Sequence, residues 1–181
     1  TDDILDRWSR RRGHDATVMI GMEERGPLGL DLVADGPHAL IAGTTGAGKS
    51  ELLRSLVVGL AAEMPPDDIN FVLVDFKGGS AFDACAALPH TVGLVTDLDE
   101  HLAGRVLRCL RAELRHREHV LRDAGSSSLD DYQQLDDRPP LPRLVLVVDE
   151  FASVAAELPE FLPSLVDIAQ RGRSLGLHLV L

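Results

Sequence analysis

The stretch that decides the fold of this chain is Gly43-Thr44-Thr45-Gly46-Ala47-Gly48-Lys49-Ser50. It matches the pattern GxxxxGK[ST] in full, and it lies between an apolar run and a helical run, which is the context that a phosphate-binding loop requires. Its glycines let the backbone curl so that several N–H groups point at one anion. We therefore expect residues Gly43 to Glu51 to bind the phosphates of a nucleotide.

Two residues of this loop have individual chemical roles. Lys49 supplies a compact positive charge for the β- and γ-phosphates, and Ser50 supplies a hydroxyl ligand for Mg²⁺. The helix that is expected to begin here presents its positive end to the same anion. The alternative is a glycine-rich turn that happens to precede a helix. The agreement of strand, loop, lysine, serine and helix disfavours that alternative.

A second apolar run, 144–148, ends in the carboxylates Asp149 and Glu150. Carboxyl ends of parallel strands gather at one edge of a sheet, where ligands bind. We expect Asp149 to reach the Mg²⁺ shell opposite Ser50, and Glu150 to polarise the attacking water as a general base. The alternative is a surface pair that merely ends a strand. No NKxD-type guanine motif is present, so the pair favours ATP over GTP.

The chain after residue 37 alternates short apolar runs with helical segments, which indicates an α/β fold with a mostly parallel sheet flanked by helices. The expected strands are 39–42, 70–74, 93–95, 144–148 and 178–181. The expected helices are 49–63, 100–124 and 159–171. The polar segment 125–142 is predicted to be an exposed or mobile loop.

The first 36 residues differ in character from the rest. A short helix is expected from Ile4 to Arg12, and the runs 17–20 and 28–33 are typical of a small hairpin. We therefore divide the chain into an N-terminal extension, 1–36, and an ATPase core, 37–181.

Charge and composition limit the function classes. The net charge is −11, from 29 acidic and 18 basic residues, whereas a domain that binds nucleic acid through phosphates usually has a basic surface. No run approaches the ~20 apolar residues of a membrane helix, and the N-terminus has no signal region. Cys85 and Cys109 lack a CxxC context, which favours buried thiols in a reducing cytosol over a zinc site.

Five separated motifs resemble those of the FtsK/SpoIIIE ATPases, in the expected order and over about residues 30 to 181. They are 43–51, 74–79, 88–90, 149–152 and 170–179. The version Phe76-Lys77-Gly78-Gly79 is more similar to the EccC motors of actinobacterial type VII secretion and related proteins than to the chromosome translocases, which more often have Pro-Lys here.

This resemblance implies a RecA-like core that assembles with other copies or tandem domains into a ring and couples Mg-ATP hydrolysis to moving a polymer. The polymer is secreted protein for EccC-like members and double-stranded DNA for the translocases. A third reading is a regulatory ATP-binding module with little turnover. Family members continue into an Ala-Thr-Gln segment beyond the position of Leu181, so we expect the core to be truncated here. We also expect a cytoplasmic domain at the membrane face of a parent protein, which would meet the membrane only through other parts.

Weaker signals leave alternatives open. Asp75 and Lys77 are equally compatible with the nucleotide site, a subunit contact or a tight turn. Arg171 and Arg173 are candidates for an arginine that acts on a neighbour's γ-phosphate, against helix-end arginines that face the dipole. The arginines of the long helix favour a solvated charged face with pairs such as Glu113 with Arg117.

Overall fold

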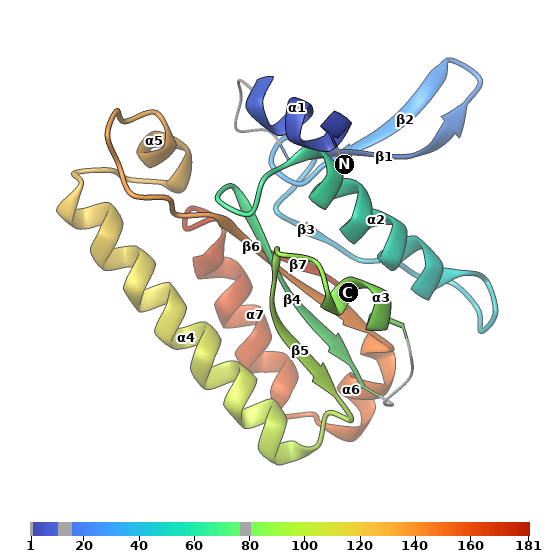
Figure 1. Ribbon diagram of the computed structural model, residues 1–181. Coiled ribbons are helices and arrows are strands. Elements are labelled where there is room, and N and C mark those ends of the chain that lie inside the picture. The colour runs from blue at the N-terminus through green and yellow to red at the C-terminus, as the bar shows by residue number, and fades with distance from the viewer. Residues whose placement is uncertain (1, 11–15, 77–80) are drawn as a thin grey trace.

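The computed structural model describes residues 2–10, 16–76 and 81–181, and its centre is a five-stranded parallel sheet in the order β3-β7-β6-β4-β5 (Figure 1). The strands are β3 His38–Ala39, β4 Ile69–Asp75, β5 Thr91–Thr96, β6 Arg143–Asp149 and β7 Leu177–Val180. The helices around them are α2 Lys49–Glu63, α3 Asp83–Ala86, α4 Glu100–Asp123, α5 Leu129–Gln133, α6 Phe151–Glu157 and α7 Phe161–Gly172. The predicted α/β class and RecA-like P-loop architecture are confirmed.

The central strands are buried on both faces, which explains their continuous apolar sequence. On β6, Val145 and Val147 belong to the core beneath α2, whereas Leu146 and Val148 belong to the core shared with α4 and α7. The same alternation along β4 puts Phe71 and Leu73 on the α2 side. The sheet therefore separates two hydrophobic layers, and the direction of each strand side chain can be read from its position.

Helix α2 begins and ends at the predicted residues. Gly48 precedes it with a φ of 89°, a left-handed conformation that favours glycine. Five apolar side chains at helical spacing face the core: Leu53, Leu56, Val57, Leu60 and Ala61. The helix ends at Met64, whose backbone is extended, and Pro65 follows directly. Glycine and proline thus fix both ends of the element.

Helix α4 contains the predicted pair of Glu113 and Arg117 but corrects its expected environment. Asp99 caps it by accepting the Leu102 N–H at 2.7 Å, and Gly125 follows with a φ of 69°. Arg117 pairs with Glu113 at 2.7 Å, yet its side chain is only 2% exposed. It also donates to the carbonyls of Leu175 and Pro142, and burial lowers its pKa. Arg117 therefore holds α4 against the neighbouring segments, and its pair with Glu113 does not belong to a solvated face.

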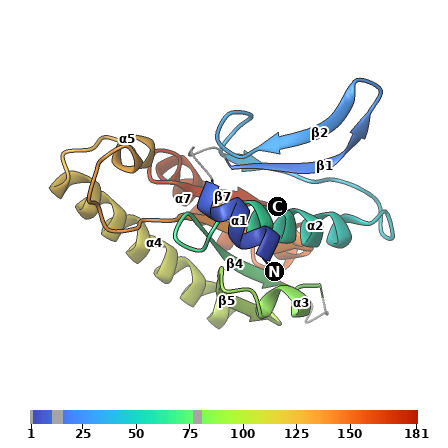
Figure 2. The same cartoon turned by 45° about the horizontal axis from the view of Figure 1, so that its top comes forward.

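The N-terminal residues form helix α1, Asp2–Arg10, and an antiparallel hairpin of β1 Thr17–Glu23 and β2 Gly26–Asp31. Figure 2 shows the hairpin apart from the main sheet, over α2. Val18 packs so tightly on α2 that a Cβ at Gly59 would lie 2.4 Å from it. The predicted hairpin is confirmed, and the predicted helix is confirmed as far as residue 10, since residues 11 and 12 lie outside the described residues. The domain boundary at residue 36 stays a prediction. None of the helices in the described segments has the length and apolar character that crossing a bilayer requires.

Segment 125–142 was wrongly predicted to be a loop throughout, because it contains α5. The Ser128 hydroxyl caps this helix by accepting the Asp131 N–H at 3.1 Å, and Leu129 and Tyr132 are buried. Serine and aspartate therefore act here as helix-start residues.

Three further predictions differ from the structure. Strand β3 is shorter than 39–42, although the Ile41 N–H still donates to Leu181 O at 2.7 Å. Helix α7 begins at Phe161, two residues after Pro159. Cys109 is exposed, although Cys85 is buried as expected, and both are free thiols.

Candidate nucleotide-binding site

The loop between β3 and α2 has the backbone of an anion cradle. Gly46 and Gly48 have φ angles of 77° and 89°, and the Ala47 N–H donates to Thr44 O at 3.1 Å, which curls the loop. Among the described residues no side chain caps the start of α2, so the first amides of the helix are left to an external acceptor. The exposed loop and these donors fit a phosphate group.

Lys49 places its charge at this loop. Its Nζ donates to the carbonyl oxygens of Gly43 at 2.8 Å and Thr44 at 3.1 Å. These weak backbone acceptors are the groups that phosphate oxygens would replace, since charge-assisted bonds to phosphate are stronger. Ser50 is half-buried at the next position, where its hydroxyl is available as a metal ligand. The Glu51 carboxylate is paired with Arg54 at 3.1 Å.

Asp149 lies at the same edge and on the same face of the sheet as the loop. Ala39 and Val147 both align with Val180 of β7, so β3 and β6 are separated by one strand, roughly 10 Å in all. Val145 and Val147 face α2, and strand alternation turns Asp149 the same way. Asp149 is 5% exposed. The predicted loop and the predicted metal-side carboxylate therefore share one corner of the molecule.

Glu150 is held in a strained backbone conformation. Its φ is 56°, a left-handed value that is uncommon for a residue with a side chain. Its N–H donates to Asp149 Oδ1 at 2.8 Å, and its Oε2 accepts from the Ser153 hydroxyl at 3.3 Å. A strained backbone persists only where the surrounding structure holds it in place, and such positions are often found at functional sites. Here it lets the chain turn from β6 directly into α6 while the exposed carboxylate stays at the sheet edge.

Asp75 is the neighbour of Asp149 across the sheet. The two residues are paired in register at the carboxyl ends of β4 and β6, and Asp75 is 3% exposed. Its Oδ2 accepts the Ala81 N–H at 3.3 Å. Sequence alone left three readings of Asp75 open, because strand order decides which residues become neighbours. Lys77, predicted together with it, lies outside the described residues.

Arg171 and Arg173 lie at the opposite edge of the sheet. Arg171 is in the last turn of α7 and Arg173 directly follows that helix, shortly before β7 begins. Arg171 donates to Glu118 at 2.7 Å, a bond that raises the pKa of Arg171. Burial lowers the pKa of His38, the first residue of β3, and the nearby positive charge of Arg173 lowers it further. Both residues therefore lie at the edge of the sheet opposite to the loop of their own chain, and a role on a neighbour's nucleotide stays a prediction.

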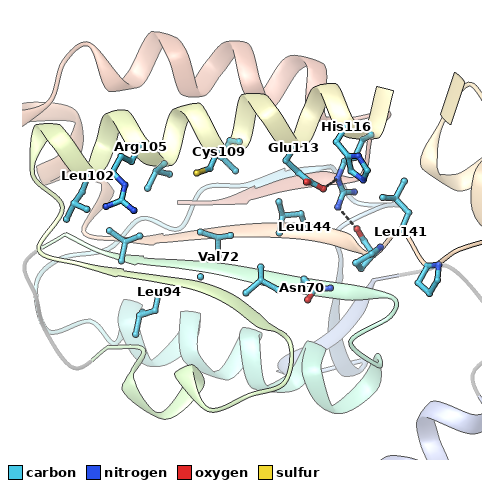
Figure 3. Close-up of a pocket in the computed structure, with 18 of the residues that line it drawn as sticks. Asn70, Val72, Leu94, Leu102, Arg105, Cys109, Glu113, His116, Leu141 and Leu144 are labelled. Atoms are coloured by element: carbon cyan, nitrogen blue, oxygen red, sulfur yellow. Dashed lines mark hydrogen bonds and ion pairs between the residues drawn. The ribbon is translucent and has the colours of Figure 1, made fainter. Parts of the chain in front are cut away.

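Sequence reasoning missed a groove of about 880 Å³ between α4 and the edge strand β5. Figure 3 shows Leu102 and Cys109 of α4 directed toward Val72 and Leu144 of the sheet. Gly93 of β5, which has no side chain, is among the residues that line the groove.

The chain matches the model of the FtsK/SpoIIIE family over residues 3–181. It is 37% identical over 188 residues to the type VII secretion system protein EssC of Staphylococcus aureus, an alignment that covers 99% of this chain and 13% of EssC. The chain thus spans about one eighth of this curated relative.

Two solved structures are similar. The cytoplasmic domain of the Thermomonospora curvata type VII secretion ATPase EccC is 41% identical with a TM-score of 0.89, over 98% of this chain and 22% of that one. ATPases 2 and 3 of T. curvata EccC in complex with a signal sequence peptide are 28% identical with a TM-score of 0.81, over 96% of this chain and 33% of that one.

Proposed function

Because this chain belongs to the FtsK/SpoIIIE family and is a P-loop ATPase domain, we propose that it energises protein translocation in a type VII secretion system. The observation that carries the proposal is the 41% identity to the EccC ATPase over nearly the whole chain. The acidic net charge of −11 favours a protein over duplex DNA as the polymer, since DNA binding gains its affinity from basic side chains.

The proposed site holds Mg-ATP between the loop and the two strand-end carboxylates. Residues Gly43 to Glu51 form the phosphate cradle, with Lys49 as its charge, and Ser50 and Asp149 are the proposed holders of Mg²⁺. When bound, Mg²⁺ would supply positive charge that neutralises the negative charge developing on the phosphates. Glu150 accepts a hydrogen bond from the attacking water and takes its proton. Support comes from the shared edge and face of the loop and Asp149.

The proposed partners follow from the same similarity. A structure of EccC ATPases 2 and 3 contains a signal sequence peptide, which supports a secreted protein as the polymer. We propose that the domain works beside other copies or tandem ATPase domains, at the cytoplasmic face of the membrane. A neighbour's Arg171 or Arg173 would then complete the site.

The test is the ATPase activity of the full-length protein with two candidate polymers. A secretion substrate that carries its signal peptide is expected to raise turnover, and duplex DNA at physiological salt is expected to leave it unchanged. Stimulation by duplex DNA alone would overturn the secretion proposal and favour a DNA translocase.

A further inference from the structure

The side chain of Arg54 joins two segments that the nucleotide site needs. It lies in the second turn of α2, the helix that begins in the phosphate loop. Its Nε donates to the carbonyl oxygen of Ala81 at 2.9 Å, and its Nη1 donates to both carboxylate oxygens of Glu51 at 3.1 Å. Glu51 directly follows Ser50, so one guanidinium connects the start of α2 with the segment that follows β4.

Both polar main-chain groups of Ala81 are held by charged side chains. Its carbonyl accepts from Arg54 of α2, and its N–H donates to Asp75 Oδ2 of β4. Asp75 is in turn the register partner of Asp149. An unbroken series of contacts therefore leads from the loop that carries Lys49 to the carboxylate side of the site.

If Arg54 only stabilised its own helix, its effect would be small and confined to α2. A helix-surface pair between Glu51 and Arg54 would contribute about 0.2–0.5 kcal/mol to the helix and nothing elsewhere. The bond to Ala81 spans 27 residues of sequence, and the Arg54 side chain is two-thirds buried, with 32% of it exposed. The planar guanidinium bonds through two separate nitrogens, an arrangement that a lysine cannot reproduce.

We infer that Arg54 is a positioning residue for ATP hydrolysis, which ties the phosphate-loop helix through Ala81 to Asp75 beside Asp149. The inference rests on the proposed function. Arg54 would act mainly on the metal and water side of the site, because the Lys49 bonds to the loop carbonyls do not involve it. Its loss should therefore lower turnover more than it lowers affinity for ATP.

The experiment compares Arg54→Met, Arg54→Lys and the control Arg115→Met in the full-length protein. Arg115 is an exposed residue of α4, on the other face of the sheet. We expect Arg54→Met to lower kcat about tenfold, as small misplacements of reacting groups do, while the Kd for ATP changes less than about twofold. Arg54→Lys should recover less than half of the lost activity, and Arg115→Met should hydrolyse ATP like the unaltered protein.

Hydrogen exchange of the Ala81 amide gives a readout that needs no turnover. Arg54→Met should accelerate it, whereas Arg115→Met should not. Unchanged kcat and unchanged exchange in Arg54→Met would overturn the inference alone, as would a loss of affinity as large as the loss of kcat. An unaltered protein that binds no ATP would instead overturn the proposed function.

Discussion

At the scale of single residues, the junction of Asp149 and Glu150 concentrates the chemistry that the site requires. Asp149 is nearly buried and accepts the backbone N–H of Glu150. The exposed Glu150 carboxylate is directed by a left-handed backbone. Burial thus suits Asp149 to the metal ion, and exposure suits the adjacent Glu150 to the attacking water. We call them the metal-side and the water-side carboxylate.

Replacing the water-side carboxylate should separate binding from hydrolysis. Glu150→Gln keeps size and shape but removes the base, so kcat should fall by about 10²–10⁴-fold, the usual contribution of general base catalysis. The Kd for ATP, measured by equilibrium titration, should stay close to that of the unaltered protein. An unchanged kcat would show that another group activates the water.

The lysine of the loop should behave in the opposite way. Lys49→Ala removes the side-chain charge that lies on the loop carbonyls of Gly43 and Thr44. We expect ATP affinity itself to fall by at least about tenfold, because a charge-assisted bond to phosphate contributes more than a neutral one. The same titration checks this, with exposed Arg115→Met as the control that should bind ATP normally.

The left-handed backbone of Glu150 should lower the free energy of unfolding of the protein, because a residue with a side chain is strained there. Glycine occupies a φ of 56° without strain, so Glu150→Gly should leave the free energy of unfolding equal or higher while hydrolysis is lost. The control Ala156→Gly, at an exposed position inside α6, should lower it by about 1 kcal/mol. Urea unfolding measures both, and an equal loss in the two variants would argue against strain at Glu150.

At the scale of elements, sequence predicted those whose ends are fixed by local chemistry. Helix α2 was predicted residue for residue, because a glycine loop and a proline pair enclose it. Helix α5 was missed, because Ser128 and the aspartates after it suit a loop as well as a helix start. Only the burial of Leu129 and Tyr132 decides between the two, and burial depends on where α7 and β7 pass.

The cap of α5 can be tested on its own. Ser128→Ala removes the hydroxyl that accepts the Asp131 N–H and should lower the free energy of unfolding by about 1 kcal/mol. Ser126→Ala, two residues earlier, is the matched control, since Ser126 donates its backbone N–H to Leu121 O at 2.8 Å and this bond survives the change. Equal effects of the two changes on urea unfolding would contradict the capping role.

At the scale of the whole molecule, the order of the strands determines which distant residues become neighbours, and the sequence alone does not reveal that order. The insertion of β7 between β3 and β6 sets the spacing of the loop from Asp149, and the pairing of β4 with β6 makes Asp75 its neighbour. The motifs revealed the chemistry of the phosphate loop, but neither Asp75 nor Arg54 could be assigned before the strands were ordered. The groove beside β5 likewise arises from packing between distant segments.

Stability of the whole domain should depend on pH through His178. Burial, and then the charge of Arg143, lower the pKa of this histidine from 6.5 to about 4. Between pH 6.5 and about 4, His178 therefore binds a proton in the unfolded chain but not in the folded chain. Stability is complete above pH 6.5 and falls toward pH 4 by up to about 1.4 kcal/mol per unit.

Urea unfolding from pH 7 to 4.5 measures this dependence. His178→Phe should reduce the slope, even if the variant is less stable throughout, and the remaining slope comes from His38 and His90, whose pKa values are also lowered by burial. His101→Phe at an exposed position should leave the slope unchanged. Equal slopes in the unaltered protein and in His178→Phe would contradict the assignment.

The loop that carries Ser50 and the strand end that carries Asp149 are proposed to hold one metal–nucleotide complex. A double-mutant cycle of Ser50→Ala and Asp149→Asn, read as the Mg²⁺ dependence of ATP hydrolysis by the full-length protein, tests it most directly. If both residues hold the same ion, the second change should add little to the first, with a coupling energy of about 1 kcal/mol or more. Losses that add to within about 0.5 kcal/mol would show that the two residues act at independent sites, and would contradict the account.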